Sequence, residues 1–167
     1  MVKILDGRVV RKKIAAALRR KISLWSRPPK LVIVQVSERQ ESNIYIAQKK
    51  SFGEAIGVTV EHCQLSKTVS TGALAKIIKR FNGDTLTDGI IVQLPLPTNL
   101  DHYEIIEMIA PAKDVDGLTS ANLGKFWQGG EDGLRPATAR AVLTLLDYYH
   151  LPVAGQRAVV IGRSGLV

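Results

Sequence analysis

Residues 31–57 read LVIVQVSERQESNIYIAQKKSFGEAIG, and this stretch sets the plan of the fold. Leu31–Val36 is an apolar, β-branched run of strand length, and such continuous apolar character is typical of a strand covered on both faces. A polar loop over residues 37–41 comes next, followed by a helix that we expect to run to about Ile56, with Gly57 as its stop. The stretch therefore predicts a buried strand and then a helix.

The same alternation of helical and strand patterns continues on both sides of this stretch. Asp6–Leu24 has apolar residues on one stripe and basic residues on the other side, as in an amphipathic helix, whereas Ala121–Gly133 is predicted to be irregular. We therefore predict an α/β fold with three layers, αβα, around a mostly parallel sheet. The further predicted elements are a strand over Val58–Leu65, a helix capped by Ser70, a short buried strand within Asp88–Pro97, helices over Asp101–Ile109 and Pro136–Tyr149, and a buried strand over Arg157–Ile161.

Composition limits the class of protein. The 167 residues carry a net charge of +8, and no apolar run is long enough to span a membrane. The single cysteine, Cys63, cannot form an internal disulfide, so we expect a cytoplasmic protein. The positive charge favours an anionic partner such as nucleic acid, a phosphorylated cofactor or a polycarboxylate. Because no aromatic residues are interleaved with the basic cluster at residues 8–21, a solvated helix face explains that cluster better than a nucleic-acid site.

Two polar side chains on the helix that follows the first strand can do chemistry together. Tyr45 and Lys49 are four residues apart, so they share one face of that helix. A lysine becomes a proton acceptor when burial or a nearby cation lowers its pKa. The alternative interpretation is a solvated tyrosine and lysine on a helix surface.

Two later stretches add further candidates. Gln93 ends the apolar part of DGIIVQLPLP, and open α/β sheets bind ligands at the carboxyl ends of their strands, although an edge-strand glutamine facing solvent is the alternative. PAKDVDG carries Asp114 and Asp116. Its D-x-D-G pattern is that of a calcium loop, but the later ligands of such a loop are missing, so we exclude an EF-hand and predict no metal site.

The final residues have the pattern with which a dinucleotide-binding unit begins. A predicted strand, RAVVI, is followed by GRSGLV, although Ser164 stands where the second glycine of G-x-G-x-x-G is expected. A complete βαβ unit needs about 30 residues or more, and six residues follow Ile161. We therefore expect one domain over residues 1–150 and the first strand of a second domain over residues 151–167.

Four motifs, in this order, resemble the bifunctional methylenetetrahydrofolate dehydrogenase/methenyltetrahydrofolate cyclohydrolase family, often called FolD. They are SNIYIAQK at 42–49, GIIVQLPLP at 89–97, KDVDG at 113–117 and VVIGRS at 159–164. The resemblance covers essentially the whole chain and implies a folate-binding catalytic domain followed by the start of a truncated, NADP-binding Rossmann domain. The chain departs from the family pattern at Ser37, where glycine is usual, and at Ala137, where the family has cysteine.

The resemblance also implies roles for individual residues. Lys49 would assist proton transfer when methenyltetrahydrofolate is hydrolysed. Tyr45 would pack on the folate and orient the lysine, and Gln93 would help to set the protonation of the lysine. Asp116 would bind the N–H donors of the pterin, which leaves Asp114 a structural role. The start of the NADP site would be formed by Gly162, Arg163 and Ser164.

The implied partners are a folate substrate, with or without a polyglutamate tail, and a second copy in a homodimer, with no nucleic acid and no membrane. Two alternatives stay open: a non-catalytic folate-binding or heteromeric subunit, and a basic nucleic-acid-binding domain. Because the helix that should follow Gly162 is absent from the sequence, we expect these 167 residues to fold but to lack NADP-dependent dehydrogenase activity.

Overall fold

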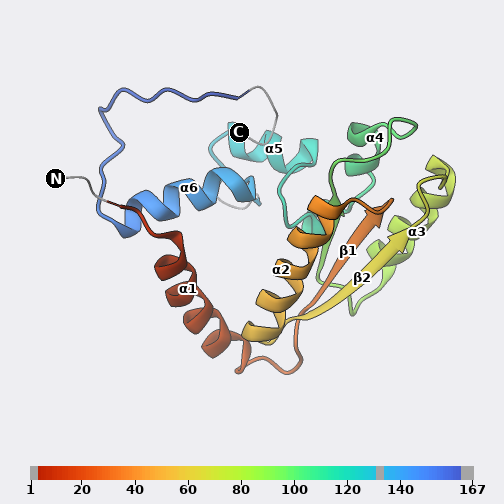
Figure 1. The fold of residues 1–167 in the computed structure, drawn as a ribbon, viewed down its shortest axis with the longest axis horizontal. Helices are drawn as coiled ribbons and strands as arrows, with labels where there is room; N and C mark the ends of the chain where they lie inside the picture. Colours follow the sequence, from red (N-terminus) through yellow and green to blue (C-terminus); the bar gives the residue numbers. More distant parts are fainter. Residues whose placement is uncertain (1–3, 131–133, 163–167) are drawn as a thin grey trace.

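A computed structural model describes residues 4–130 and 134–162 of the chain, and Figure 1 shows its arrangement. Helices and strands alternate along most of its length. The elements are α1 (Gly7–Ile22), β1 (Lys30–Val36), α2 (Gln40–Ile56), β2 (Thr59–Leu65), α3 (Thr71–Gly83), β3 (Gly89–Gln93), α4 (His102–Glu107), a 3₁₀ turn η1 (Pro111–Lys113), α5 (Ser120–Trp127) and α6 (Ala137–Tyr148).

The three strands form a parallel sheet in the order β2-β1-β3, with β1 in the centre. Ile33 in β1 is the register partner of His62 in β2 and of Ile91 in β3. The carboxyl ends of all three strands therefore meet at one edge of the sheet. Helix α2 lies on one side of the sheet and α3 with α4 on the other, so the predicted three-layer α/β fold is confirmed (Figure 1).

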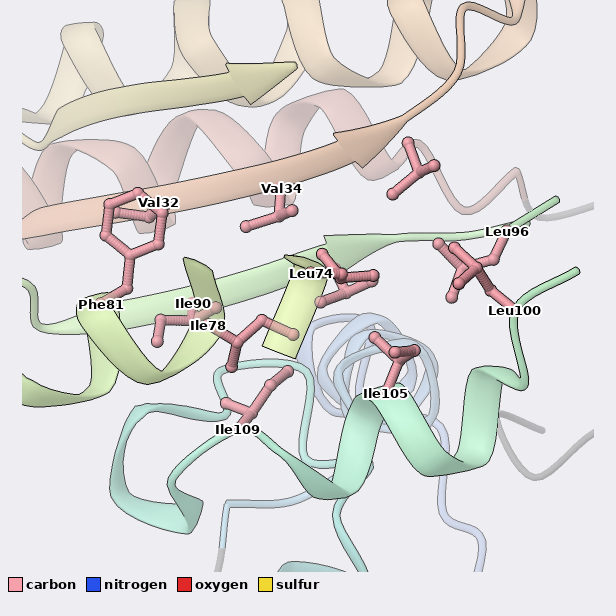
Figure 2. Close-up of a cluster of buried hydrophobic side chains, with 12 residues drawn as sticks. Val32, Val34, Leu74, Ile78, Phe81, Ile90, Leu96, Leu100, Ile105 and Ile109 are labelled. Atoms are coloured by element: carbon pink, nitrogen blue, oxygen red, sulfur yellow. The ribbon is translucent and has the colours of Figure 1, made fainter. Parts of the chain in front are cut away.

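The larger apolar core lies between the sheet and the α3–α4 side (Figure 2). Val32 and Val34 project from β1 into this core, where they meet Leu74 and Ile78 of α3, and all four side chains have no exposed surface. Ser70 starts α3 by accepting a hydrogen bond from the backbone N–H of Ala73, as expected for a helix cap. The apolar stripe of α3 is thus aimed at the sheet from its first turn.

The opposite face of the sheet has a smaller apolar cluster. Ile33, Ile91 and Ile46 of α2 are its buried members. Gly57 ends α2 in the left-handed conformation, with φ of 88°, as its place in the sequence predicts. On the outer side of α2 lies α1, which in turn contacts α6 (Figure 1). Tyr149 links these outer helices, since its hydroxyl accepts from the backbone N–H of Asp6 and donates to the Asp6 carbonyl.

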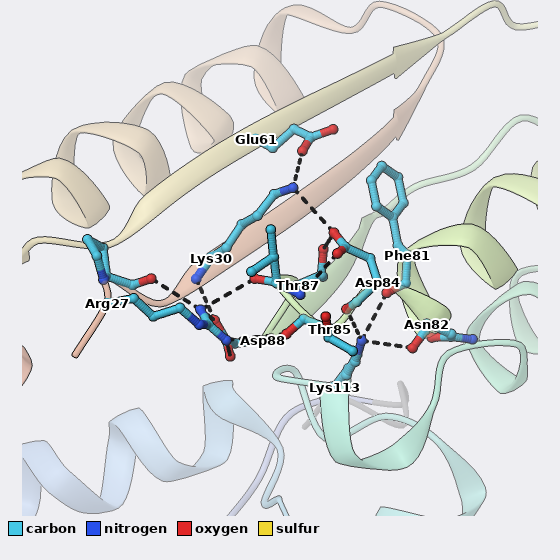
Figure 3. Close-up of polar contacts among 12 residues, drawn as sticks. Arg27, Lys30, Glu61, Phe81, Asn82, Asp84, Thr85, Thr87, Asp88 and Lys113 are labelled. Atoms are coloured by element: carbon cyan, nitrogen blue, oxygen red, sulfur yellow. Dashed lines mark hydrogen bonds and ion pairs between the residues drawn. The ribbon is translucent and has the colours of Figure 1, made fainter. Parts of the chain in front are cut away.

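Polar contacts hold the amino edge of the sheet (Figure 3). Asp88, just before β3, accepts two 2.7 Å hydrogen bonds from the Arg27 guanidinium and one from the backbone N–H of Lys30. Lys113 donates to the backbone carbonyls of residues 81, 82 and 84 at the end of α3. The Asp88 contacts join the starts of β1 and β3, and the Lys113 contacts join η1 to the end of α3.

Two expectations about local structure are wrong. Ala121–Gly133 is predicted to be irregular, but residues 120–127 form α5, whose first turn is capped by the Thr119 side chain, while residues 131–133 lie outside the described residues. The buried strand predicted over Arg157–Ile161 is not formed: the described residues beyond α6 contain no strand, and Val159 and Ile161 are 88% and 94% exposed. An apolar run becomes a strand only when another strand pairs with it, and nothing in the described part of the chain does so here. Among the described residues, no helix is long and apolar enough to cross a membrane.

The α3 core should dominate stability. We expect Leu74→Ala to lower the free energy of unfolding by about 2–5 kcal/mol, because it leaves a cavity beside Val34 in a fully buried layer. Chemical denaturation measures the change. The matched control is Leu86→Ala, whose side chain is 59% exposed and should change stability by less than about 0.5 kcal/mol. Equal losses in the two variants would contradict this account of the core.

Candidate functional site

Helix α2 carries the first two candidates at different depths. Ile46 is buried against the sheet, Tyr45 on the neighbouring side is 59% exposed, and Lys49 is partly buried. Because α2 lies across the face of β1 and β3, a side chain one turn beyond Tyr45 reaches toward the carboxyl end of β3. The structure therefore places Lys49 inward and leaves the Tyr45 ring open to solvent.

Lys49 and Gln93 are joined by a hydrogen bond across 44 residues of sequence. The Lys49 ammonium donates to Gln93 Oε1 at 3.0 Å. Gln93 Nε2 donates to the Leu94 carbonyl at 2.8 Å, and this second bond fixes which end of the amide faces the lysine. A strand end at the carboxyl edge of the sheet thus presents an oriented acceptor to the amine, which agrees with the predicted place of Gln93.

The electrostatics of the site couple Lys49 to Asp116. Burial lowers the pKa of Lys49 below its ordinary value, and the Asp116 carboxylate opposes that shift. Burial raises the pKa of Asp116, while the Lys49 charge lowers it and the Asp114 charge raises it. Burial therefore disfavours the charged form of each side chain, and the opposite charge of the other side chain favours it. Lys49 gives up its proton more readily than a solvated lysine does.

Asp114 is the aspartate that holds the loop. Its buried carboxylate accepts hydrogen bonds from the backbone N–H groups of Gly117 and Thr119 and from the Asn122 side chain. Gly117 has φ of 70°, and a Cβ there would lie 2.6 Å from the Leu134 carbonyl oxygen, so the turn needs glycine for two reasons. The carboxylate oxygens of Asp114 thus face N–H donors, and Asp116 lies in the loop that these hydrogen bonds hold.

The remaining predicted residues lie elsewhere. Gly162 is exposed and belongs to the extended segment after α6, while Arg163 and Ser164 lie outside the described residues. The structure thus brings Lys49, Gln93 and Asp116 together and gives no geometry for the predicted dinucleotide residues. No cluster of metal-ligating side chains occurs within residues 4–130 and 134–162.

Comparison with known proteins decides the family. Residues 5–116 match the family described as tetrahydrofolate dehydrogenase/cyclohydrolase, catalytic domain. The chain belongs to this family. The resemblance read from the four sequence motifs is therefore confirmed, and the matched range ends on Asp116.

Solved structures of this family superpose closely on the chain. A FolD methylenetetrahydrofolate dehydrogenase/cyclohydrolase from Campylobacter jejuni has a TM-score of 0.96 at 32% identity over 99% of this chain. A methylenetetrahydrofolate dehydrogenase from the silkworm Bombyx mori has a TM-score of 0.95 at 31% identity over 100% of it. A Trypanosoma brucei FolD, solved with NADP and an inhibitor, has a TM-score of 0.92 at 32% identity over 98% of it. The chain spans 60%, 59% and 57% of the lengths of these three proteins.

Sequence reasoning missed one group that supports the folate-family site. Asn122 is 3% exposed, donates to the carbonyl of Pro111 and to Asp114, and accepts from the backbone N–H of Leu134. It therefore joins three segments around the loop that carries Asp116. The sequence signal was a threonine, Thr119, of a residue type that often caps a helix, but the Gly-rich stretch after it favours an irregular chain.

The coupling between Lys49 and Asp116 makes a direct prediction. We expect Asp116→Asn to lower the pKa of Lys49 further, because the substitution removes the negative charge that supports the ammonium while burial is unchanged. NMR titration of the lysine side chains measures the shift. Glu104→Gln, on the exposed side of α4, removes a charge elsewhere and should leave Lys49 unchanged. An unchanged or raised Lys49 pKa in Asp116→Asn would show that the two groups do not interact.

Proposed function

We propose that this chain carries the folate-binding, catalytic half of an enzyme of one-carbon metabolism. The enzyme oxidises methylenetetrahydrofolate to methenyltetrahydrofolate with NADP and hydrolyses the product to formyltetrahydrofolate. The observation that carries the proposal is the hydrogen bond between Lys49 and Gln93, with Asp116 beside it, at the carboxyl edge of a parallel sheet in a member of this family. These three side chains come from α2, β3 and the loop after η1, so only the folded chain assembles them.

The hydrolytic step suits a lysine with a lowered pKa. Methenyltetrahydrofolate carries positive charge at its one-carbon bridge, and a cation next to Lys49 pushes the amine further toward its neutral form. A neutral amine can then accept a proton as water adds to the bridge carbon, and return it as the ring opens. Gln93 Oε1 accepts from Lys49 and keeps the amine directed at the edge of the sheet where the substrate would lie.

Asp116 and Tyr45 are the proposed contacts to the folate itself. A carboxylate accepts two parallel N–H bonds well, and the amino group and ring N–H of a pterin offer such a pair. Asp116 is suited to this because Asp114 makes the bonds that hold the loop. The exposed ring of Tyr45, one turn before Lys49, is available to pack on the flat part of the folate.

The cofactor half of the proposal concerns residues 151–167. We infer that they begin the NADP-binding domain, with Gly162, Arg163 and Ser164 at its phosphate-binding turn, as separate from the folate domain of residues 1–150. The strand-and-glycine pattern supports this, as does the NADP present in the Trypanosoma brucei relative. The chemistry proposed for the described residues rests on Lys49, Gln93 and Asp116, with Tyr45 as a further contact to the folate.

Charge supports a polyanionic form of the folate. The net charge of +8 favours a substrate with several carboxylates, such as a polyglutamylated folate. A groove of about 660 Å³ at the carboxyl ends of β1 and β2 is lined in part by Arg39 and Lys67, on the same edge of the sheet as Gln93. A cytoplasmic homodimer is proposed on the family resemblance, with the lone Cys63 in keeping with that compartment.

The role of Lys49 can be tested by removal of its amine. We expect Lys49→Met to reduce hydrolysis of methenyltetrahydrofolate by about 10²-fold or more, because the proton acceptor is lost while the aliphatic stem remains. Spectrophotometric loss of methenyltetrahydrofolate measures the rate, and Lys12→Met on the exposed side of α1 is the matched control. Unchanged hydrolysis in Lys49→Met would refute the catalytic role. A wild-type chain that binds folate without hydrolysing its methenyl form would favour the non-catalytic subunit.

Substitution of Asp116 and of Asp114 should affect different properties, folate binding and stability respectively. We expect Asp116→Asn to weaken folate binding by about 10- to 100-fold with little loss of stability, because a charged acceptor for the pterin is lost. Asp114→Asn should instead lower the free energy of unfolding by about 1–3 kcal/mol, because the carboxylate that accepts from the Gly117 and Thr119 N–H groups becomes an amide. Calorimetric titration and chemical denaturation of both variants separate the outcomes, and the reverse pattern would exchange the two roles.

A further inference from the structure

A chain of polar side chains lies between α2 and the sheet, beside the Lys49–Gln93 pair. Gln35 of β1 is 1% exposed, and its amide donates to Asn43 Oδ1 of α2 at 2.8 Å. His62 Nε2 of β2 contacts Gln35 Oε1 at 2.8 Å, and His62 Nδ1 lies 3.3 Å from the Lys50 ammonium of α2. This series of hydrogen bonds therefore begins at Asn43 of α2, passes through β1 and β2, and ends at Lys50 of α2.

The donor and acceptor roles along this chain are consistent with one another. Because Gln35 donates through Nε2, its Oε1 is left to accept, and His62 must donate to it from Nε2. His62 Nδ1 then carries no proton and accepts from Lys50. Burial lowers the pKa of His62, and the Lys50 charge lowers it further, which keeps the ring in this neutral form. From β1 the ring meets only the neutral amide of Gln35, while the neighbouring Glu61 is paired with Lys30.

The position of the chain connects it to the proposed catalytic lysine. Asn43 and Lys50 are seven residues apart, about two helical turns, so the two attachment points lie on one stripe of α2. Lys49 is next to the second attachment point. Gln35 and Gln93 are register partners on adjacent strands, so the buried amide lies beside the acceptor of Lys49.

The buried apolar cluster between α2 and the sheet is small. The buried apolar cluster here has three members, Ile33, Ile46 and Ile91, whereas the opposite core has twelve. Aliphatic contacts tolerate a helix that rolls or slides, while hydrogen bonds with fixed donors and acceptors do not. The polar chain thus supplies the directional contacts that the small cluster lacks.

We propose that Asn43, Gln35, His62 and Lys50 are positioning residues: their hydrogen bonds set the rotation of α2 on the sheet so that Lys49 reaches Gln93. The catalytic role of Lys49 rests on the proposed function, but the placement of its amine does not. When these hydrogen bonds are lost, α2 can rotate on the sheet and the Lys49 amine moves toward water.

The experiment titrates Lys49 by NMR without folate in four variants. Gln35→Leu removes the central amide at similar volume, and His62→Leu removes the ring; in both we expect the pKa of Lys49 to rise toward that of a solvated lysine. His62→Gln keeps an N–H for Gln35 Oε1 and should retain most of the lowered pKa. Gln64→Leu is the matched control, since Gln64 is the exposed register partner of Gln35 in β2 and should leave the Lys49 pKa unchanged.

Kinetics and stability complete the test. Where methenyltetrahydrofolate is hydrolysed, Gln35→Leu should lower kcat by about 10- to 100-fold with a smaller change in KM, as expected for a misplaced catalytic group. If Gln35→Leu does not fold, Asn43→Ala breaks the same chain at its exposed end and carries the test. Variants that lose thermal stability while Lys49 titrates as in the wild type would overturn the proposal. A wild-type protein without hydrolytic activity would refute the proposed function and leave the titration to decide the positioning role.

Discussion

The structure depends on the parallel pairing of β1 with a strand on each side. This pairing leaves Val32 and Val34 on one face and Ile33 on the other with no exposed surface, so both faces of the sheet must be covered by helices. It also brings three strand ends to one edge, where backbone groups beyond the ladder and side chains such as Gln93 are presented together. The catalytic candidates therefore lie at the carboxyl edge of the sheet, beyond the part of β1 that the helices cover.

The two edges of the sheet serve different purposes. At the amino edge, Asp88 accepts from Arg27 and Lys30, and Lys113 donates to three carbonyls at the end of α3, so these charges are used within the fold. At the carboxyl edge, the Lys49 and Asp116 charges are partly buried and depend on each other. Lys113 ends η1 and Asp116 follows it by three residues, so one short segment contributes a charged side chain to each edge.

The extent to which sequence predicts this molecule differs by element. Strand β1 and helix α2 were predictable because their patterns are local: a β-branched apolar run, and a helical stretch that ends at Gly57. Helix α5 was missed because the glycine in S-A-N-L-G-K weakens a helical reading, while the capping bond from Thr119 is visible only in the structure. The strand expected over Arg157–Ile161 failed for the opposite reason: its local pattern is strong, but strand formation depends on a partner that local pattern does not specify.

The candidate site was predictable to a similar, uneven degree. The rule for strand ends placed Gln93 correctly, and one-turn spacing put Lys49 and Tyr45 on one helix, but only the family resemblance distinguished Asp116 from Asp114. The chain through Gln35 and His62 could not be foreseen, because it joins residues 27 apart in sequence by contacts that depend on strand register. Its one sequence signal is the glutamine inside an apolar strand, which must find partners once it is buried.

Mutual dependence of Lys49 and Asp116 gives the proposed site a response to its substrate. Burial disfavours the charged form of each group and the opposite charge favours it, so a loss of either charge disfavours the other. A folate whose N–H donors bind Asp116 engages that carboxylate, and the positive charge of its methenyl bridge opposes the ammonium. Both effects of the same ligand act on Lys49 in one direction, toward the neutral amine. Under the proposed function, substrate binding therefore favours the neutral amine of Lys49, and the hydrogen bond to Gln93 holds that amine in place.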